Sequence, residues 1–289
     1  MQFNTICLSG GGDKGLIIIG ILQKCIEYCI INLKDITKFY GTSVGSFLNL
    51  FMVLGYSIEE ICNFFLDLNF EEFEPNINID ILFTNLGLDD GVKFKLLINK
   101  VISTKLKKDN INFLELFSLT KKELYVVSFN YTKNKEVLFS HKTTPYISVT
   151  DAIRASCCVP MFYEPIKIKN NLFIDGGIIN NFPINYCNLD ETLGICFKSN
   201  IIIENNLMNY MNNLFCILFQ NLNFKHNIDY SKVFVIENND SFINFNLNKE
   251  EKKKNLLKGE NICENICNTN LNFLAIKIVK KIIKDSLIK

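Results

Sequence analysis

The sequence predicts an α/β protein built on a parallel β-sheet, and three features of the chain support this prediction. Strand, turn and helix patterns alternate twice within residues 5–54, as is typical of parallel sheets. Of the 289 residues, 48% are hydrophobic, which suits one large domain or two small ones with a substantial core. The formal net charge of +1 provides no overall positive field that would favour nucleic-acid binding.

The N-terminal elements define this pattern most clearly. We expect a first strand at Thr5–Ser9 and a first helix over Gly15–Ile31, with a glycine cluster between them. Ile36–Tyr40 is the second expected strand, and Val44–Leu54 is the second helix. Phe70–Asp90 is rich in Asn and acidic residues and has weak periodicity, so it is expected to be a loop or a lid-like insertion.

Further elements are expected along the rest of the chain. The expected strands lie at 124–129, 136–139, 166–168, 172–174, 193–197 and 233–236. The expected helices lie at 149–155, at 207–222 and from Lys249 onward. Turns at 133–134 and 170–171 would join two pairs of strands into hairpins.

The eleven cysteines and the N-terminus favour a reducing compartment. An odd number of cysteines at irregular spacing does not form a disulfide framework, so most should be small buried side chains. No basic segment precedes the first strand. The longest apolar stretch, Leu16–Ile31, is interrupted by Gln23, Lys24 and Glu27 and is too short and polar to span a membrane. We therefore expect a cytoplasmic protein, or one bound peripherally to a membrane.

A glycine-rich turn, Gly10–Gly15 (GGGDKG), lies between the first strand and the first helix. It fits G-x-G-x-x-G, but the second strand ends without the carboxylate that a dinucleotide site needs. A Walker loop is excluded because Lys14 precedes Gly15 and no Ser or Thr follows it. Converging glycine amides at a helix start suit a phosphate or a developing oxyanion. A plain glycine turn is the alternative.

A second motif, Gly41–Gly45 (GTSVG), follows the second strand and has the G-x-S-x-G pattern of a nucleophile elbow. Neighbouring parallel strands end at the same edge of a sheet, so Ser43 and the glycine-rich turn should face one crevice. A third motif is Asp175-Gly176-Gly177, directly after a strand. The simplest alternative to a functional role for this motif is an Asp-Gly turn that closes a hairpin.

Together, the three motifs resemble the signature of the patatin-like phospholipases in order and spacing. Ala155–Pro160 (ASCCVP) and Asn181–Pro183 (NFP) resemble flanking segments of that family, although Cys158 stands where the family more often has alanine. The resemblance covers residues 5–200. It implies a three-layer α/β/α fold with a mainly parallel central sheet, and the rest of the chain, residues 201–289, would be a C-terminal strand and helix extension packed on this domain.

The resemblance also implies a Ser–Asp dyad, with Ser43 as nucleophile and Asp175 as general base. The amides of Gly10, Gly11 and Gly12 would form the oxyanion hole. Residues that support the motifs would be Lys14, Gly15, Gly41, Gly45, Gly176 and Gly177. The implied reaction is hydrolysis of a fatty acyl ester of a lipid or phospholipid, of phospholipase A or lysophospholipase type, through an acyl-enzyme and without metal or cofactor.

Two other functions are compatible with the same residues. An esterase of the α/β-hydrolase type would use Ser43, Asp175 and His226, which occur in the right chain order. However, the elbow follows the second strand immediately after the glycine-rich turn, and no loop motif surrounds His226. A non-catalytic lipid-binding protein is the other alternative, and retention of both Ser43 and Asp175 argues against it.

The C-terminal segment, residues 249–289, contains ten lysines and five acidic residues. Leucines and isoleucines at 271, 274, 278, 282 and 287 approximate one helical stripe, and lysines at 277, 280, 281 and 284 lie on another face. Such a helix would either lie on an anionic membrane surface or pack its stripe on the domain. Both interpretations remain open at this point.

Overall fold

The computed structural model describes residues 3–75, 78–199, 230–238 and 243–269, together with residues 210, 213, 214, 216, 217 and 273. Its central sheet is built from eight strands, β1 (Thr5–Leu8), β2 (Lys38–Thr42), β4 (Glu123–Asn130), β5 (Lys135–Phe139), β7 (Ile166–Ile168), β8 (Asn171–Asp175), β9 (Thr192–Ser199) and β10 (Val233–Asn238). Their order is β10-β9-β1-β2-β4-β8-β7, and β5 also pairs with β4. A separate pair joins β3 (Gly87–Asp89) to β6 (Met161–Tyr163).

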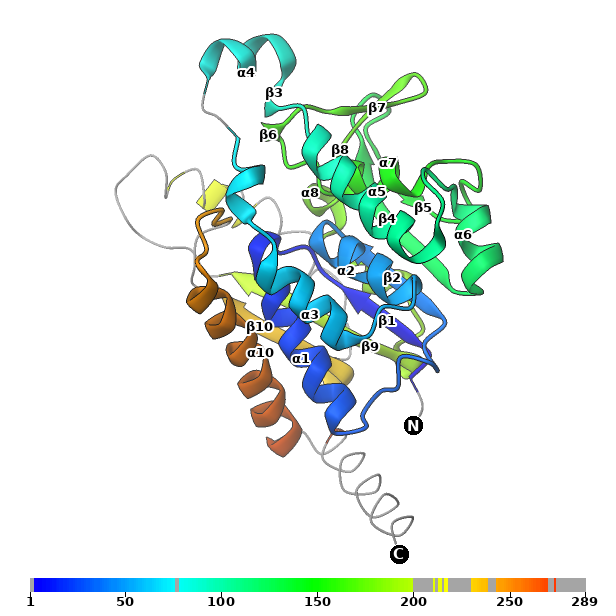
Figure 1. Cartoon of the computed structure of the whole chain (residues 1–289), viewed down its shortest axis with the longest axis vertical. Coiled ribbons are helices and arrows are strands. Elements are labelled where there is room, and N and C mark those ends of the chain that lie inside the picture. Colours follow the sequence, from blue (N-terminus) through cyan, green and yellow to red (C-terminus); the bar gives the residue numbers. More distant parts are fainter. Residues whose placement is uncertain are drawn as a thin grey trace, which may run out of the picture.

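The described helices are α1 (Gly15–Glu27), α2 (Val44–Val53), α3 (Ile58–Asp67), α4 (Ile79–Asn85), α5 (Val92–Leu106), α6 (Phe113–Thr120), α7 (Val149–Ser156), α8 (Gly177–Asn180) and α10 (Lys249–Thr269). Short 3₁₀ helices are η1 (Gly12–Lys14), η2 (Phe70–Phe73), η3 (Pro183–Tyr186), η4 (Leu189–Glu191) and η5 (Tyr230–Lys232). Figure 1 shows α1, α2, α3 and α10 together on one face of the sheet.

The sheet is mainly parallel, as predicted. The strands from β10 to β4 run parallel, whereas β5 and β8 are antiparallel to β4. β1 lies between β2 and β9, with Thr5 paired to Lys38 and Leu8 paired to Gly41. The carboxyl ends of β1 and β2 therefore meet at one edge, which brings the glycine-rich turn beside Ser43.

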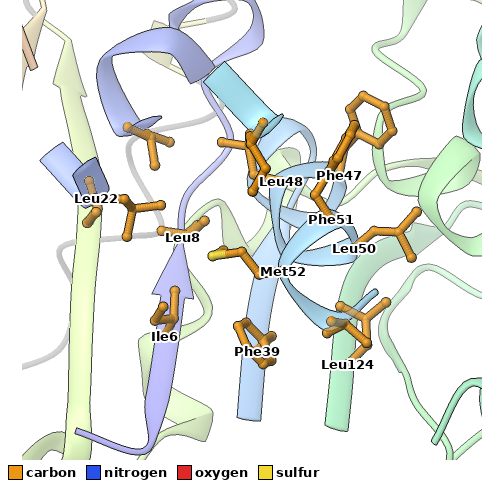
Figure 2. Close-up of a cluster of buried hydrophobic side chains, with 14 of the residues drawn as sticks. Ile6, Leu8, Leu22, Phe39, Phe47, Leu48, Leu50, Phe51, Met52 and Leu124 are labelled. Carbon is orange, nitrogen blue, oxygen red and sulfur yellow. The ribbon is translucent and has the colours of Figure 1, made fainter. Parts of the chain in front are cut away.

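The core follows from alternation along the strands, because successive side chains of a strand point to opposite faces. On the helix-covered face, Ile6 and Leu8 of β1 and Phe39 of β2 lie beneath α2 (Figure 2). On the other face, the rings of Tyr40 and Tyr125 stack with centroids 4.1 Å apart, in a cluster with residues at and next to η3.

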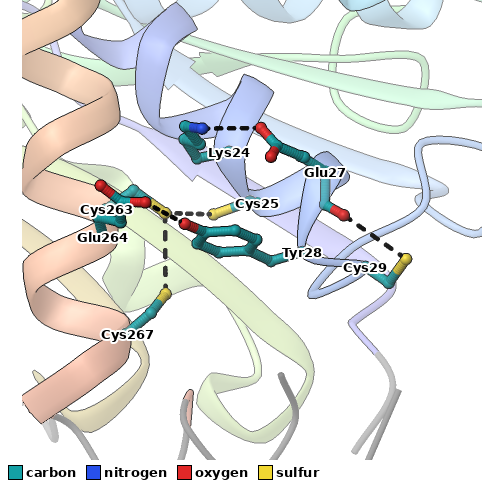
Figure 3. Close-up of polar contacts among 8 residues, drawn as sticks. All are labelled: Lys24, Cys25, Glu27, Tyr28, Cys29, Cys263, Glu264 and Cys267. Atoms are coloured by element: carbon teal, nitrogen blue, oxygen red, sulfur yellow. Dashed lines mark hydrogen bonds and ion pairs between the residues drawn. The ribbon is translucent and has the colours of Figure 1, made fainter. Parts of the chain in front are cut away.

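Helix α10 packs closely along α1. A Cβ at Gly20 would overlap the carbonyl oxygen of Leu256, and a Cβ at Gly259 would overlap that of Ile17, so both glycines permit the close approach. The Sγ atom of Cys263 lies 3.7 Å from that of Cys25 and 3.8 Å from that of Cys267 (Figure 3). Tyr28 donates a 2.5 Å hydrogen bond to Glu264 at the same interface.

The cysteines and the C-terminal helix agree with expectation where they are described. The structure describes all eleven cysteines, none of them forms a disulfide, and eight are buried. The chain is helical over 249–269. The proposed apolar stripe and lysine face beyond residue 270 lie outside the described residues. In the part of the chain that the structure describes, no helix combines the length and apolarity needed to cross a membrane.

Three predictions of secondary structure need correction. Residues 70–90 are not one loop but contain η2, α4 and β3, whose short lengths give little periodicity. The first helix ends at Glu27 instead of Ile31, because Cys29 adopts a left-handed φ of 54° and breaks it. Helices α3, α5 and α6 were not predicted. The helix expected at 207–222 lies mostly outside the described residues.

Candidate active site

Ser43 lies in a sharp turn between β2 and α2. Its backbone has φ 51° and ψ −129°, a conformation that side-chain-bearing residues rarely adopt. A Cβ at Gly41 would come within 2.7 Å of the backbone of Gly45 and Ser46, and one at Gly45 would lie 2.5 Å from the carbonyl oxygen of Leu8. Both glycines therefore permit a turn that is packed against β1, as a nucleophile elbow requires.

The backbone of Ser43 is held by two other serines. Its amide donates a 2.8 Å hydrogen bond to Oγ of Ser156 at the end of α7. The hydroxyl of Ser156 donates in turn to the carbonyl oxygen of Val127 on β4, at 2.5 Å. The hydroxyl of Ser46 donates to the carbonyl oxygen of Ser43. The sequence indicated the segment of Ser156 only as a flanking resemblance, so its contact with Ser43 is a new observation.

Asp175 ends β8 beside Ser43 and is completely buried. Its Oδ1 accepts a 2.7 Å hydrogen bond from the amide of Gly177, and its Oδ2 has no hydrogen-bond partner among the described residues. Burial raises the pKa of Asp175 to about 7, although the Gly177 amide and the Ser43 hydroxyl both lower it. A carboxylate with this pKa can exchange a proton near neutral pH.

The alternative of a hairpin turn at Asp175 is wrong. The hairpin of β7 and β8 is closed at the opposite end of β8, where Ile168 pairs with Asn171. Asp175 instead leads directly into α8. Gly176 is needed there because a Cβ would overlap the carbonyl oxygen of Val127.

Among the described residues, the glycine-rich turn offers two amides without an acceptor instead of three. The amide of Gly10 donates a 3.1 Å hydrogen bond to the carbonyl oxygen of Asn181, so the expectation that it serves an oxyanion is wrong. Asn181 Nδ2 also donates to the carbonyl oxygen of Gly10, at 3.4 Å. The amides of Gly11 and Gly12 have no acceptor within the described residues. They can therefore receive a developing negative charge.

The other members of the turn have structural contacts. Lys14 is 4% exposed and forms a 3.3 Å ion pair with Asp13, so its side chain is held within the turn and is not solvated. Asp13 also accepts a 3.0 Å hydrogen bond from the amide of Asn244, and burial raises the pKa of Asp13. A Cβ at Gly15 would lie 2.8 Å from the side chain of Val44, so this glycine brings α1 close to the elbow.

An apolar cavity opens beside Ser43 and encloses about 700 Å³ including its mouth. Six phenylalanines contribute to its wall, at positions 47, 65, 70, 73, 94 and 245. Cys157 also lines it, and burial raises the pKa of this thiol, so the thiol stays protonated. No sequence pattern predicted this cavity, because its phenylalanines come from separate segments of a chain that contains 25 of them.

Neither histidine has been placed at this site. His141 stacks on Phe117 with centroids 4.1 Å apart and is absent from the residues that line the cavity. His226 lies outside the described residues, so a role for it stays a prediction. Among the described residues, no group of three or more His, Cys, Asp or Glu side chains is arranged to hold a metal ion.

Comparison with known proteins agrees with this geometry. The family model for patatin-like phospholipases matches residues 6–187, which include the elbow, the glycine-rich turn and Asp175. The chain belongs to the patatin-like phospholipase family. It is also 30% identical over 278 residues to the "Probable lipid hydrolase 463L" of Invertebrate iridescent virus 6, a match that covers 91% of each chain.

Two solved structures have a fold similar to that of this chain. VipD from Legionella pneumophila superposes with a TM-score of 0.68 at 16% identity, covering 93% of this chain and 67% of VipD. Full-length ExoU from Pseudomonas aeruginosa, in its complex with SpcU, has a TM-score of 0.52 at 14% identity and is matched over 51% of its length. At these identities the likeness concerns the fold alone.

Proposed function

We propose that this patatin-like protein hydrolyses fatty acyl esters of lipids with Ser43 as nucleophile and Asp175 as general base. One observation carries the proposal most directly. A buried carboxyl group has a pKa of about 7, and its Oδ2 has no hydrogen-bond partner among the described residues. It lies beside a serine in a strained elbow at the wall of an apolar cavity.

In the acylation step, Ser43 Oγ forms a bond to the acyl carbonyl carbon while its proton passes to Asp175 Oδ2. The carbonyl oxygen becomes an oxyanion and accepts hydrogen bonds from the amides of Gly11 and Gly12. One such donor is worth about 3–4 kcal/mol in comparable sites. When the ester bond breaks, the leaving alcohol takes the proton from Asp175. An acyl group is then attached to Ser43.

Deacylation repeats these roles with water. Asp175 accepts a proton from the attacking water, the same two amides stabilise the second oxyanion, and Ser43 Oγ leaves as it regains a proton. The acyl chain would occupy the apolar cavity, because the phenylalanines there offer no hydrogen-bonding groups and favour hydrocarbon.

The proposal also covers the domain organisation, location and partners of the protein. Residues 5–200 would form the hydrolase domain and residues 201–289 its extension, which is supported by the packing of α10 on α1. We further propose that the protein is cytoplasmic, contacts lipid membranes peripherally and has no nucleic-acid partner. The net charge of +1 supports the last point.

A fluorophosphonate probe tests the nucleophile directly, because it labels activated serines. We expect labelling of the wild-type protein at Ser43, found by peptide mass spectrometry, and no labelling of Ser43→Ala. A parallel assay should measure fatty acid release from phosphatidylcholine, lysophosphatidylcholine and triacylglycerol. Labelling without release from any acyl lipid would contradict the proposed substrate class, and absence of labelling would favour a binding protein.

A further inference from the structure

Four large apolar side chains project into solvent at one end of the molecule. On α4 and its C-cap, Ile81 is 39% exposed, Phe83 is 78% exposed and Leu86 is 57% exposed. Met161 on β6 is 43% exposed. We call these four residues the apolar crest. Figure 1 shows α4, β3 and β6 together at the end of the molecule far from the C-terminal end of α10.

The members of the crest are held together by the small sheet of β3 and β6. Leu86 directly precedes Gly87, and Gly87 pairs with Met161 in that sheet. Asn85 Nδ2 donates a 2.5 Å hydrogen bond to Glu164 Oε1, which also ties the end of α4 to the chain after β6. The crest is therefore a surface of defined shape, although its residues come from two distant parts of the sequence.

Two residues of the crest adopt a backbone conformation that does not suit them. Leu86 has a φ of 64° and Met161 has a φ of 70°, both in the left-handed region. Glycine and asparagine occupy that region more readily than leucine or methionine. Because these two residues are also exposed, by 57% and 43%, neither backbone preference nor core packing explains the choice of a large apolar residue there.

The crest adjoins the cavity beside Ser43. Strand β6 carries Met161 of the crest and also Tyr163, which lines the cavity. The hydroxyl of Tyr163 donates a 2.9 Å hydrogen bond to the carbonyl oxygen of Phe73, a cavity residue in η2. A lipid surface that contacts the crest would thus lie close to the elements that frame the cavity.

The charge around the crest restricts which lipid surface fits it. The segment of Met161, residues 157–169, contains one carboxylate and two lysines, whereas residues 70–96, which carry the other three crest residues, contain six carboxylates and two lysines and form a negatively charged segment. An anionic membrane would repel this segment, whereas a zwitterionic one would not. Apolar side chains gain free energy from the hydrocarbon boundary whatever the headgroup charge.

We infer that the apolar crest docks on an electrically neutral lipid surface, such as a phosphatidylcholine bilayer, with Phe83, Leu86 and Met161 inserted. This inference rests on the proposed function, because the docked lipid would also be the substrate. It places membrane contact at α4 and β6, independent of the lysine-rich C-terminal segment.

Vesicle binding tests the inference apart from catalysis when Ser43→Ala is present in every protein. The crest variant is Phe83→Ser/Leu86→Asn, and asparagine is chosen because it tolerates the left-handed conformation. The matched control is Leu119→Gln/Tyr146→Ser, which removes side chains that are 51% and 78% exposed elsewhere. We expect partitioning onto phosphatidylcholine vesicles to fall at least about tenfold in the crest variant and to change little in the control.

Several outcomes would overturn the inference. One is equal binding of the crest and control variants to vesicles. Another is stronger binding to vesicles that contain phosphatidylserine than to pure phosphatidylcholine. A third is that the crest variant only converts a dimer of this chain to monomers, which would mean that the crest contacts a second copy and not lipid. The melting temperature of Leu86→Asn should not fall, and a fall would mean that the crest is structural.

A hydrolysis assay with Ser43 intact separates this inference from the proposed function. The crest variant should hydrolyse a short-chain, water-soluble ester as fast as wild type and hydrolyse vesicle lipid more slowly. If wild type fails on every ester, the proposed function is wrong, while vesicle binding still decides the role of the crest. Equal loss on soluble and vesicle substrates would contradict the docking role.

Discussion

The amide of Ser43 and the hydroxyl of Ser156 are joined by a 2.8 Å hydrogen bond across 113 positions of the chain. Ser156 also donates to Val127, so one buried hydroxyl connects the elbow after β2 with strand β4. The left-handed conformation of Ser43 is therefore supported from outside its own turn. This support is what a strained residue needs in order to persist.

Replacing Ser156 by alanine should impair the elbow. The change leaves the buried Ser43 amide and the Val127 carbonyl without this partner, which costs about 1–3 kcal/mol for each such group. We expect a lower melting temperature and a reduced kcat with little change in KM, measured on a soluble ester. Ser103→Ala, at a partly exposed position, is the control. An unchanged kcat in Ser156→Ala would show that Ser43 needs no such positioning.

The dyad should behave as one unit. Ser43→Ala and Asp175→Asn should each reduce ester hydrolysis to near background, and the double variant should be little worse than either single variant. His141→Ala and His226→Ala should stay within a few-fold of wild type. Steady-state hydrolysis of a soluble ester should be measured for all five variants and for wild type. If His226→Ala were as inactive as Ser43→Ala, a Ser–Asp–His triad would replace the dyad.

Activity should depend on pH through Asp175. A general base acts only when it is deprotonated, and burial raises the pKa of this carboxyl to about 7. We therefore expect kcat/KM to rise with pH and level off above an apparent pKa near 7, whereas a base with the usual pKa of about 4 would give a flat profile from pH 5 upward. A profile of kcat/KM from pH 5 to 9 distinguishes the two.

The same pKa shift predicts that Asp175 destabilises the fold at neutral and higher pH. Because its pKa is higher in the folded than in the unfolded state, the folded protein binds more protons between about pH 4 and 7, and its contribution to stability falls as pH rises through that window. Asp175→Asn should therefore gain melting temperature relative to wild type at pH 8 but not at pH 4.5. Equal differences at both pH values would contradict the raised pKa.

Gly11→Ala should lower turnover by about a hundredfold or more, the scale of one lost oxyanion donor. The cause is contact and not backbone strain, since Gly11 has an extended φ of 178° and an added Cβ would overlap the ring of Phe197. Replacing that ring with the smaller leucine side chain, in Gly11→Ala/Phe197→Leu, should restore part of the activity. Full activity in a folded Gly11→Ala protein would exclude the Gly11 amide as a donor.

Local patterns in the sequence predicted the elements that frame the site. The first strand, the elbow and the parallel pairing of β1 with β2 follow from short motifs and from periodicity over a few residues. Alternation also predicted that β4 and β5 pair as an antiparallel hairpin, which is confirmed. Elements of this kind are specified by neighbouring residues, so sequence patterns can identify them.

Contacts between distant segments could not be predicted in this way. Gly10 loses its free amide to the carbonyl of Asn181, which becomes its neighbour only when the sheet forms. The cavity gathers phenylalanines from five separate parts of the chain, and no spacing rule connects Phe47 with Phe245. Even the pKa of Asp175 depends on complete burial, which a single strand cannot reveal.

The packing of α10 on α1 has a consequence for how the protein is made. Cys25 and Cys263 touch across 238 positions, and α1 buries Leu16, Ile17 and Ile19 in a core to which α10 contributes. A ribosome adds about 5–20 residues per second, so on the order of tens of seconds pass between the synthesis of α1 and that of the helix that covers it. During that interval the side of α1 that faces α10 in the folded protein has no partner, so its apolar surface stays exposed until translation is nearly complete.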